Sequence, residues 1–378
     1  MLSWEFPPDA ESGVSSHVMG LSRALARAGH SVVVVTRAHA DAPDDDEVGG
    51  VRVIRVPVDI PWLPEDDDVA VVASANHHLV AALSHLRHFE PDVVHAHDWN
   101  TAWAGNVSAR VLGVPLVTTI HATERGRHGG HVPQGAPAAV NAVEWWSAMT
   151  STRVVCLSRF MAREIVEGFE LDPAQVRLVP NGVEVRDWAP PDPAPTRDAH
   201  VMSWGRVQYE KGFQVLAQAM ARVRGRVPGV RCTIAGRGPY LPELQSQVDI
   251  EGVGDLVNLA GYVPDDELRT SLHRAGCVVI PSLYEPFGVV ALEALAAGAP
   301  VVAARTGGLA ETLDGTGAAL LFEPGNAARL AEAIETVLSD TSVRTELATR
   351  GRELLHDRFS WDAIAATTAG VYSEARLS

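Results

Sequence analysis

The sequence predicts an α/β protein with two doubly wound, Rossmann-like domains. Short valine-rich apolar runs alternate with helical stretches in both halves of the chain, which is typical of parallel sheets covered by helices on both faces. The chain has 378 residues, more than one hydrophobic core usually holds, so two domains are expected. Two such domains facing a central cleft would present strand carboxyl ends and helix N-termini to a ligand.

The expected elements follow this alternation in order. The first half carries a helix at 15–28 and then strands at 31–36, 92–97, 115–121 and 153–158. The second half carries strands at 200–203, 231–235, 277–281 and 300–304, followed by an amphipathic helix at 361–375.

Domain limits and loops come from composition. The proline-rich segment 190–195 is the best candidate for a linker, and the acidic run 41–47 is expected to be a solvated loop. We predict an N-terminal domain at 1–180, a C-terminal domain at 181–359, and a closing helix at 360–378 that packs back on the first domain.

Charge and cysteine usage limit the partners and the compartment. The formal net charge of -16 argues against a nucleic-acid interface, which needs a basic face. No basic-then-apolar leader is present, and the longest apolar stretch, 289–304, is better explained as helix, turn and strand than as a membrane span. Cys156, Cys232 and Cys277 lie in strand-like runs, as buried thiols of a reducing compartment do. We expect a cytoplasmic monomer or homodimer; the first strand is short, and whether residues precede Met1 stays open.

The turn at 205–212 is the first motif with chemical content. It follows the predicted strand 200–203. Arg206 can place a guanidinium fork on phosphate oxygens, and Lys211 adds a point charge. An ordinary surface turn with two solvated cations would explain the residues alone equally well. The position at a strand carboxyl end favours binding of a diphosphate.

Two carboxylates, Glu285 and Glu293, flank a predicted helix start. Phe287 and Gly288 form the junction between loop and helix, where backbone N–H groups can bind phosphate. Glu293 shares a helix face with apolar residues, and burial of a bare carboxylate is costly unless it is hydrogen-bonded. Ribose hydroxyls would supply those bonds. The alternative is an exposed glutamate on an alanine-rich helix. A functional role is favoured because Glu285 is a second carboxylate in an unusual place, at the mouth of the expected cleft.

Three weaker signals lie in the turns. Thr306, Gly307 and Gly308 open a helix and can aim amides at a diphosphate, although a turn that needs a positive φ explains them equally well. Gly13 lies in the loop between the first strand and the first helix. Tyr262 is expected near the nucleotide base, without choosing between uridine and adenosine.

Polar residues also follow the strands of the first half. His121 and Glu124 lie just past a predicted strand, where sites gather, although a lone histidine there is more often structural. His128 lies in a glycine-rich loop and could contact an acceptor. His95 and His97 share a strand face, but no third ligand has a convincing spacing, so we expect no metal site.

Taken together, these segments resemble the retaining nucleotide-sugar glycosyltransferases of family 4, which have the GT-B fold. Residues 3–8 and 119–128 look most like those of the actinobacterial α-1,4-glucan glucosyltransferases, relatives of glycogen synthase. The likeness covers essentially the whole chain, through Pro7-Pro8, His97-Asp98-Trp99, His121, residues 180–183 and 205–212, Glu285, Glu293 and Trp361.

The resemblance implies a role for each residue of the second half. Arg206 and Lys211 would hold the donor diphosphate and stabilise the leaving group. Glu293 would bind the ribose hydroxyls, and Glu285 would face the donor sugar, where the sequence leaves it open as a nucleophile. His121, from the first half, would contact that sugar near its 6-hydroxyl.

The resemblance also assigns the first loop and the acceptor side. Gly13 would let the loop approach the diphosphate, and Asp98 and Glu124 would lie toward the sugar or the acceptor. The family's usual Gly-Gly in this loop reads Ser12-Gly13 here. The added Cβ of Ser12 bears on how the loop closes.

The implied reaction is transfer of glucose, with retention, from UDP- or ADP-glucose to the non-reducing end of an α-1,4-glucan or maltooligosaccharide, with no metal or other cofactor. One alternative is a family 4 transferase with another sugar, such as mannose, or with a lipid-linked acceptor. A nucleotide-sugar epimerase belongs to another class, and the cations Arg206 and Lys211 disfavour it. A dinucleotide oxidoreductase is weaker still, since no Gly-x-Gly-x-x-Gly follows a first strand. A non-catalytic sugar-binding protein stays open because of Ser12.

Overall fold

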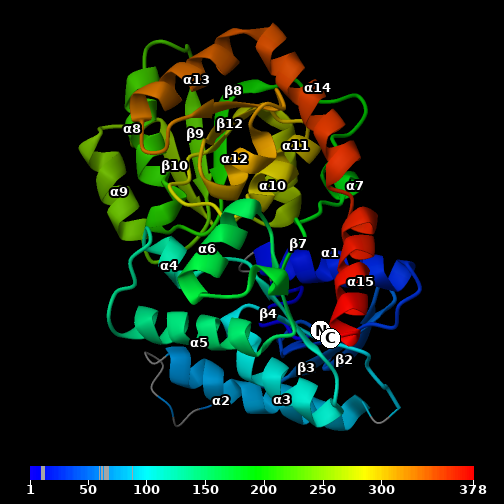
Figure 1. Ribbon diagram of the computed structural model, residues 1–378. Coiled ribbons are helices and arrows are strands. Elements are labelled where there is room, and N and C mark those ends of the chain that lie inside the picture. The colour runs from blue at the N-terminus through cyan, green and yellow to red at the C-terminus, as the bar shows by residue number, and fades with distance from the viewer. Residues whose placement is uncertain (10–12, 59, 61–62, 64–67, 87) are drawn as a thin grey trace. The chain divides into compact units, whose positions relative to one another are not determined.

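The computed structural model describes residues 1–9, 13–58, 60, 63, 68–86 and 88–378 (Figure 1). The chain divides into two compact units, each with its own sheet and core. Unit 1 comprises Met1–Gly182 and Trp361–Ser378, and unit 2 comprises Val183–Ser360. Ser12, where the first loop departs from the family pattern, lies outside the described residues.

Unit 1 is built on a largely parallel sheet in two parts. The first part has the order β1 (Val33–Arg37), β3 (Val51–Val56), β2 (Asp45–Val48), and the second has the order β4 (Val94–His97), β5 (Leu116–Ile120), β6 (Arg153–Cys156), β7 (Val176–Leu178). Leu2 makes single parallel bridges to Val35 in β1 and to Ala96 in β4. The expected short first strand is therefore reduced to the bridges of Leu2, which join the two parts.

The acidic run 41–47 is in part a strand, so the prediction of a loop is wrong for its last residues. β2 pairs antiparallel with β3, with Asp45 opposite Ile54. The side chains of Asp45 and Arg52 form an exposed ion pair at 2.6 Å between Oδ2 and Nη2. An edge strand tolerates such charges because one of its sides faces water.

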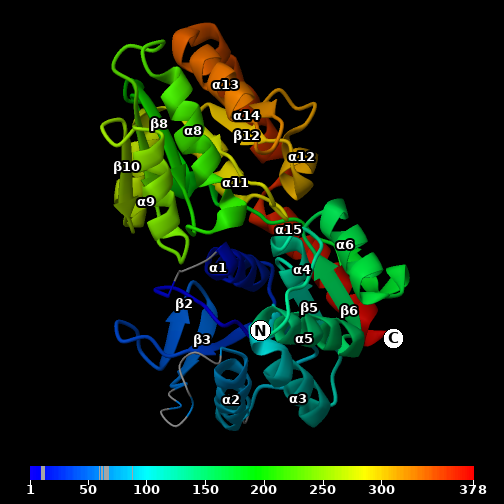
Figure 2. The same cartoon turned by 90° about the vertical axis from the view of Figure 1, so that its left-hand side faces the viewer.

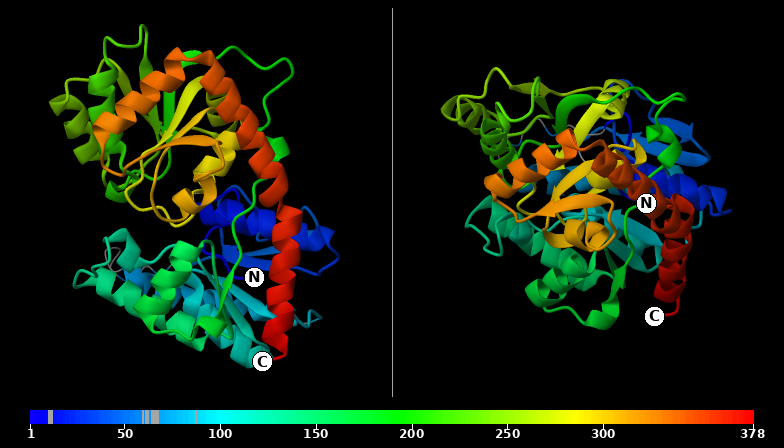
Figure 3. Two further views of the ribbon diagram at one scale, coloured as in Figure 1. Left: turned by 45° about the horizontal axis from the view of Figure 1, so that its top comes forward. Right: turned by 90° about the horizontal axis from the view of Figure 1, so that it is seen from above.

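The helices of unit 1 cover this sheet. They are α1 (Gly13–Arg27), α2 (Asp68–Ala81), α3 (Ala102–Leu112), α4 (Glu124–Arg127), α5 (Ala136–Thr150), α6 (Arg159–Phe169) and α15 (Trp361–Arg376), with 3-10 turns η1 (Ala82–Leu86), η2 (Trp99–Thr101) and η3 (Pro173–Gln175). The C-terminal helix α15 packs against α1 (Figure 3). Its Trp361 ring fills the space over Gly20 and Gly182, where an added Cβ would lie only 2.2 and 2.6 Å from ring atoms.

One helical segment among the described residues, Val69–Leu86, is long and apolar enough to cross a membrane by length and composition alone. It covers most of α2 and the turn η1. Ala75, Leu79 and Ala82 within it are buried, and α2 packs against α3 and α5. The core helix of a globular unit passes the same test.

Unit 2 holds a fully parallel six-stranded sheet. Its order is β10 (Val257–Gly261), β9 (Arg231–Ala235), β8 (Asp198–Trp204), β11 (Ala275–Ile280), β12 (Val301–Ala304), β13 (Ala319–Phe322). Its helices are α7 (Val185–Trp188), α8 (Phe213–Val223), α9 (Leu241–Ile250), α10 (Asp265–Arg274), α11 (Val289–Ala296), α12 (Gly307–Leu313), α13 (Ala327–Ser339) and α14 (Thr341–Arg358), with the 3-10 turn η4 (Tyr209–Lys211).

The strand order of unit 2 reverses between β8 and β11. From β8 the chain moves outward through β9 to β10, and then returns to β11 and moves the other way. Helix α8 packs against both α9 and α13 (Figure 2), and α11 packs against α14. In such doubly wound sheets, ligands bind at the carboxyl ends of the strands where the order reverses.

The proline-rich segment 190–195 does not separate the two units, contrary to the linker prediction. It lies inside unit 2, between α7 and β8. Helix α7 packs against α11, and the Trp188 carbonyl accepts a hydrogen bond from His273 Nε2 at 2.9 Å. The chain is therefore already tied to unit 2 before the prolines begin.

Candidate active site

An ion pair marks the reversal point of unit 2. β8 leads into the turn that carries Lys211, and β11 leads into the loop that carries Glu285. Lys211 Nζ lies 2.9 Å from Glu285 Oε2. The Ser282 hydroxyl donates a second hydrogen bond to the same carboxylate oxygen at 3.1 Å. Glu285 is buried and Lys211 is partly exposed, so the cation forms the accessible side of the pair.

Gly212 brings the two loops of this ion pair together. Its φ is +70°, and an added Cβ would lie 2.0 Å from the carbonyl oxygen of Pro281. The Leu283 N–H donates to the Glu210 carbonyl at 2.7 Å in the same contact. Only glycine permits this backbone approach, which places Lys211 beside the loop of Glu285.

A third cation, Arg237, joins the predicted ones at neighbouring strand ends. Arg206 is exposed, and its turn is fixed by the N–H of Val207, which donates to the Arg237 carbonyl at 2.8 Å. The Arg237 guanidinium carbon lies 5.6 Å from the centre of the Tyr262 ring, and Tyr262 is 57% exposed. Sequence reasoning missed Arg237, although residues 236–238 repeat the pattern of a glycine-flanked cation after a strand.

Glu293 lies at the same reversal point and is half-buried. Burial raises its pKa to about 8, and a hydrogen bond from the Trp204 side chain opposes that shift. Trp204 is the last residue of β8, so α11 directs this carboxyl group at the end of the central strand. The alternative of an exposed glutamate is thereby contradicted.

The junction before α11 is held by packing. The Phe287 ring is buried and makes an edge contact with Phe359, with centroids 6.0 Å apart. Gly288 precedes the first residue of α11 with a φ of +96°, and an added Cβ there would lie 2.7 Å from Leu309. Phe287 therefore supports the loop from beneath, and Gly288 sets the direction in which α11 starts.

The turn at Thr306, Gly307 and Gly308 is tied to the loop of Glu285. The Thr306 hydroxyl donates to the Leu283 carbonyl at 3.0 Å, and the Gly308 N–H donates to the Glu285 carbonyl at 3.0 Å. Gly307 has a φ of +50° and begins α12. The Gly308 amide thus already has a backbone acceptor.

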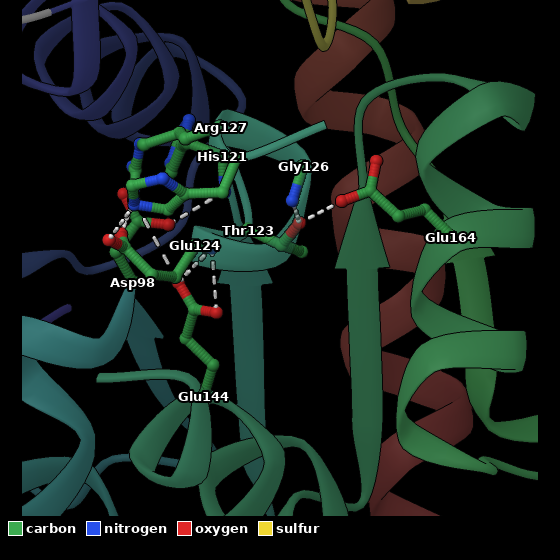
Figure 4. A network of polar contacts seen from close by, with 9 residues as sticks. Asp98, His121, Thr123, Glu124, Gly126, Arg127, Glu144 and Glu164 are labelled. Atoms are coloured by element: carbon green, nitrogen blue, oxygen red, sulfur yellow. Dashed lines mark hydrogen bonds and ion pairs between the residues drawn. The ribbon is translucent and has the colours of Figure 1, made fainter. Parts of the chain in front are cut away.

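A second polar cluster lies in unit 1, past the carboxyl ends of β4 and β5 (Figure 4). Asp98 has a φ of +59°, which is uncommon for a residue other than glycine. Its Oδ1 accepts a hydrogen bond from the backbone N–H of His121 at 2.7 Å. Strained backbone of this kind is often found at functional sites. Here it brings the loops after the two strands into contact.

Glu124 is the centre of this cluster (Figure 4). Its carboxylate pairs with Arg127 at 2.9 Å and with His128 Nε2 at 3.1 Å. Its backbone N–H lies 3.0 and 2.9 Å from the two carboxylate oxygens of Glu144. Burial raises the pKa of Glu144 to about 8, while Arg127 opposes the shift. Glu144 escaped prediction, although it is a carboxylate on a mostly apolar helix, the signal that pointed to Glu293.

Four imidazoles gather beside this cluster. His97 Nδ1 lies 3.2 Å from His121 Nε2, and the His17 ring centre lies 4.7 Å from that of His121. Burial lowers the pKa of His121 to about 3 and holds the pKa values of His17, His95 and His97 well below 6.5. All four rings are therefore neutral at pH 7.

The structure thus brings the predicted residues into two groups. Gly13 is the exposed first residue of α1, next to residues outside the described part of the chain. Unit 2 holds Arg206, Lys211, Tyr262, Glu285, Phe287, Gly288, Glu293, Thr306, Gly307 and Gly308, and unit 1 holds Gly13, Asp98, His121, Glu124 and His128.

Comparison with known proteins covers the whole chain. Residues 12–187 match the family model described as Glycosyltransferase Family 4, and residues 185–354 match the one described as Glycosyl transferases group 1. The chain is 38% identical over 390 residues to a protein of Mycobacterium tuberculosis named glycogen synthase, covering 100% of this chain and 94% of that protein. It is 32% identical to a D-inositol 3-phosphate glycosyltransferase of Xylanimonas cellulosilytica, covering 96% of this chain and 92% of that one.

The fold also has solved counterparts. Sucrose-phosphate synthase from Thermosynechococcus elongatus superposes with a TM-score of 0.83 at 24% identity, covering 99% of this chain and 97% of that one. This likeness confirms the predicted fold class.

Proposed function

Because the chain belongs to the family 4 and group 1 glycosyltransferases, we propose that it transfers glucose from UDP- or ADP-glucose to an α-1,4-glucan. The acceptor would be the 4-hydroxyl at the non-reducing end of a glucan or maltooligosaccharide, and the anomeric configuration would be retained. The observation that carries the proposal is the 38% identity, over the full chain, to the protein named glycogen synthase.

In this proposal unit 2 binds the donor. Lys211, Arg206 and Arg237 neutralise the diphosphate, whose negative charge increases as the bond from C1 of glucose to the phosphate oxygen breaks. Glu293 accepts hydrogen bonds from the ribose hydroxyls, which would compensate its burial. These cations are already in place before the reaction. They therefore stabilise the developing negative charge without the free-energy cost of reorganising.

Unit 1 would contribute the groups around the sugar and the acceptor. His121 is neutral, so its ring can exchange a hydrogen bond with the 6-hydroxyl of glucose without placing a charge beside the sugar. Asp98 fixes the backbone of His121. Glu124 and His128 would contact the acceptor, with Glu144 and Arg127 as positioning residues.

We propose same-face attack as the retaining step. The acceptor 4-hydroxyl oxygen bonds to C1 as the phosphate leaves, and the departing phosphate oxygen takes the hydroxyl proton. This balance needs no metal and no external base. Glu285, held by Lys211 and Ser282, faces the donor sugar and stabilises positive charge on it.

A second candidate has a different acceptor. The relative named D-inositol 3-phosphate glycosyltransferase matches 96% of this chain. A polyol phosphate is therefore the first acceptor to test beside glucans.

The test is transfer of labelled glucose from UDP-glucose and from ADP-glucose, each with glycogen, with maltooligosaccharides, with inositol phosphate and without acceptor. Linkage analysis of the product follows. An α-1,4-extended glucan supports the proposal and chooses the donor. Donor consumption with inositol phosphate alone supports the second candidate, and turnover without any acceptor contradicts both.

Donor binding can be measured without turnover, because Lys211 is the only lysine of the chain. An amine-reactive reagent should label Lys211, and a bound nucleotide sugar should protect it. Mass spectrometry of the peptide that contains residue 211 reads the label at this lysine alone.

A further inference from the structure

Three histidines that lie far apart in the sequence converge in unit 1. His17 comes from α1, His97 ends β4, and His121 follows β5. One ring nitrogen from each lies within 4.8 Å of those of the other two. His17 and His97 are almost completely buried, at 3% and 1% exposure, while His121 is partly exposed.

The nitrogens of these rings are not satisfied by hydrogen bonds alone. His17 Nδ1 bonds to the Asn181 side-chain oxygen, which makes that nitrogen the donor and leaves Nε2 with its lone pair. This buried Nε2 has no hydrogen-bond partner among the described residues. A buried nitrogen of this kind is costly unless it bonds to something.

His97 and His121 face each other with the spacing of two ligands of one ion. Their nitrogens Nδ1 and Nε2 are 3.2 Å apart and share a hydrogen bond, which a bound ion would replace. In a tetrahedral zinc site with Zn–N bonds of about 2.0–2.1 Å, two ligand nitrogens are separated by about 3.4 Å. His17 Nε2 would complete the set once its ring turns toward the other two nitrogens, since the three ligand nitrogens already lie within 4.8 Å of one another.

His95 does not belong to this set, although it is adjacent on the strand. Its Nδ1 bonds to the Tyr372 hydroxyl at 2.7 Å, and its Nε2 bonds to the Thr119 hydroxyl at 2.7 Å. Both of its nitrogens are therefore engaged, whereas His17 has one left for an ion. Sequence spacing does not group these residues, because His17 and His121 come close to His97 only through the fold.

We propose that His17, His97 and His121 bind a divalent transition-metal ion, with zinc as the best fit. Three imidazoles with one open position are a common zinc ligand set. The open position lies on the side of His121, the exposed member. Asn181, which fixes the ring of His17, is the outer-shell partner that such sites usually have. The carboxylate of Asp98, which accepts a hydrogen bond from the backbone N–H of His121, supplies nearby negative charge.

Under the proposed function His121 contacts donor glucose, so an ion bound to His121 would compete with the donor. Zinc is therefore expected to inhibit transfer, with donor concentration relieving the inhibition and a chelator reversing it.

The experiment measures metal binding on the full-length chain, without turnover. The chelator-treated protein is titrated with Co²⁺, whose visible absorption reports coordination by nitrogen, and the bound Co²⁺ is then displaced by Zn²⁺. We expect one ion per chain. His17→Gln should weaken binding by at least about 100-fold, and Asn181→Ala should weaken it by about 10–100-fold, as loss of an outer-shell partner does.

A matched control uses other neighbouring histidines. His77 and His78 are adjacent on α2, with ring centres 4.0 Å apart, and replacing both with glutamine should leave the affinity unchanged. The proposal is overturned if the chain binds no Co²⁺, if His17→Gln binds as tightly as the unchanged chain, or if only the His77 and His78 variant loses binding. Circular dichroism tests whether each variant is folded. If His17→Gln does not fold, the milder Asn181→Ala variant provides the test of metal binding.

Metal binding and glucose transfer are measured separately, so the metal site and the proposed function can be refuted independently. A chain that extends glucan but binds no metal refutes the metal site alone. A chain that binds one ion at these histidines but transfers no glucose refutes the proposed function alone.

Discussion

Replacing Lys211 with methionine removes one charge and retains most of the side-chain volume. Lys211 Nζ lies 2.9 Å from Glu285 Oε2, and Coulomb's law at an effective dielectric constant of about 20 gives a gross attraction of about 6 kcal/mol at that distance. A phosphate oxygen at a similar distance would gain a similar gross energy, of which desolvation offsets a part. We therefore expect kcat/KM to fall by about 10²–10³, the range seen when one donor to a developing oxyanion is removed.

The same change should also weaken folding, because it leaves the buried carboxylate of Glu285 without its cation. Breaking a buried pair costs about 3–5 kcal/mol, and the 26% exposure of the Lys211 side chain reduces this to about 1–3 kcal/mol. The double variant Lys211→Met with Glu285→Gln removes the unpaired charge and should recover stability.

Kinetics of Lys211→Met and denaturant unfolding of both variants test the two roles of Lys211. We expect the double variant to regain stability, whereas its rate should stay low because Glu285 is itself assigned to the donor sugar. A near-normal rate in Lys211→Met would show that the cation does not bind the diphosphate. Recovery of the rate in the double variant would contradict the roles of both Lys211 and Glu285 at the donor.

Three further changes test the packing and the charges. Gly212→Ala should lower the free energy of unfolding by about 2–5 kcal/mol, because its Cβ would lie 2.0 Å from the Pro281 carbonyl oxygen. Gly229→Ala has a similar φ of +68° but no atom within 4 Å, so in the same urea titration it should cost only about 1–2 kcal/mol. The pKa of Glu293 is raised from 4.5 to about 8 in the folded chain, so between these pH values the folded form keeps a proton that the unfolded chain has released. The free energy of unfolding should therefore fall as the pH rises from 4.5 to about 8. Glu293→Gln should reduce that fall by about 2–4 kcal/mol, measured by urea titrations at several pH values. Trp361→Ala should lower the thermal stability of unit 1 by about 3–5 kcal/mol, since the buried ring is removed, whereas Trp145→Ala, at an exposed position, should have little effect in calorimetry.

The sequence was sufficient wherever the pattern is local. Strand runs such as 277–281 and 300–304 are continuous apolar stretches between helices, and the structure has β11 and β12 there. The motif residues Lys211 and Glu285 follow such strands, so their meeting at one sheet edge could be expected from parallel topology alone. The edge strand β2 could not be expected, because its acidic residues carry the composition of a loop and only the pairing with β3 makes them a strand.

What the sequence could not supply is the partner of each group. Glu144 is found by its position on an apolar helix, but its bond to the Glu124 N–H depends on how α5 packs beside α4. The same holds for His17, whose neighbours His97 and His121 are brought to it by three separate elements. Motif spacing carries information within one element and its following loop, whereas contacts between elements depend on strand order and helix packing.

Composition gives one more argument about Lys211. The chain has one lysine among its 31 Lys and Arg residues, so arginine serves at every other basic position. The narrow contact between Gly212 and the Pro281 carbonyl leaves a compact ammonium group 2.9 Å from Glu285. A planar guanidinium fork would need a wider space and would pair with both carboxylate oxygens, which would hold it on Glu285 rather than on a phosphate. Lys211→Arg should therefore retain stability but recover at most about a tenth of the rate lost in Lys211→Met, as judged by kcat/KM at matched donor concentrations. Full recovery of the rate by arginine would mean that positive charge alone suffices at this position.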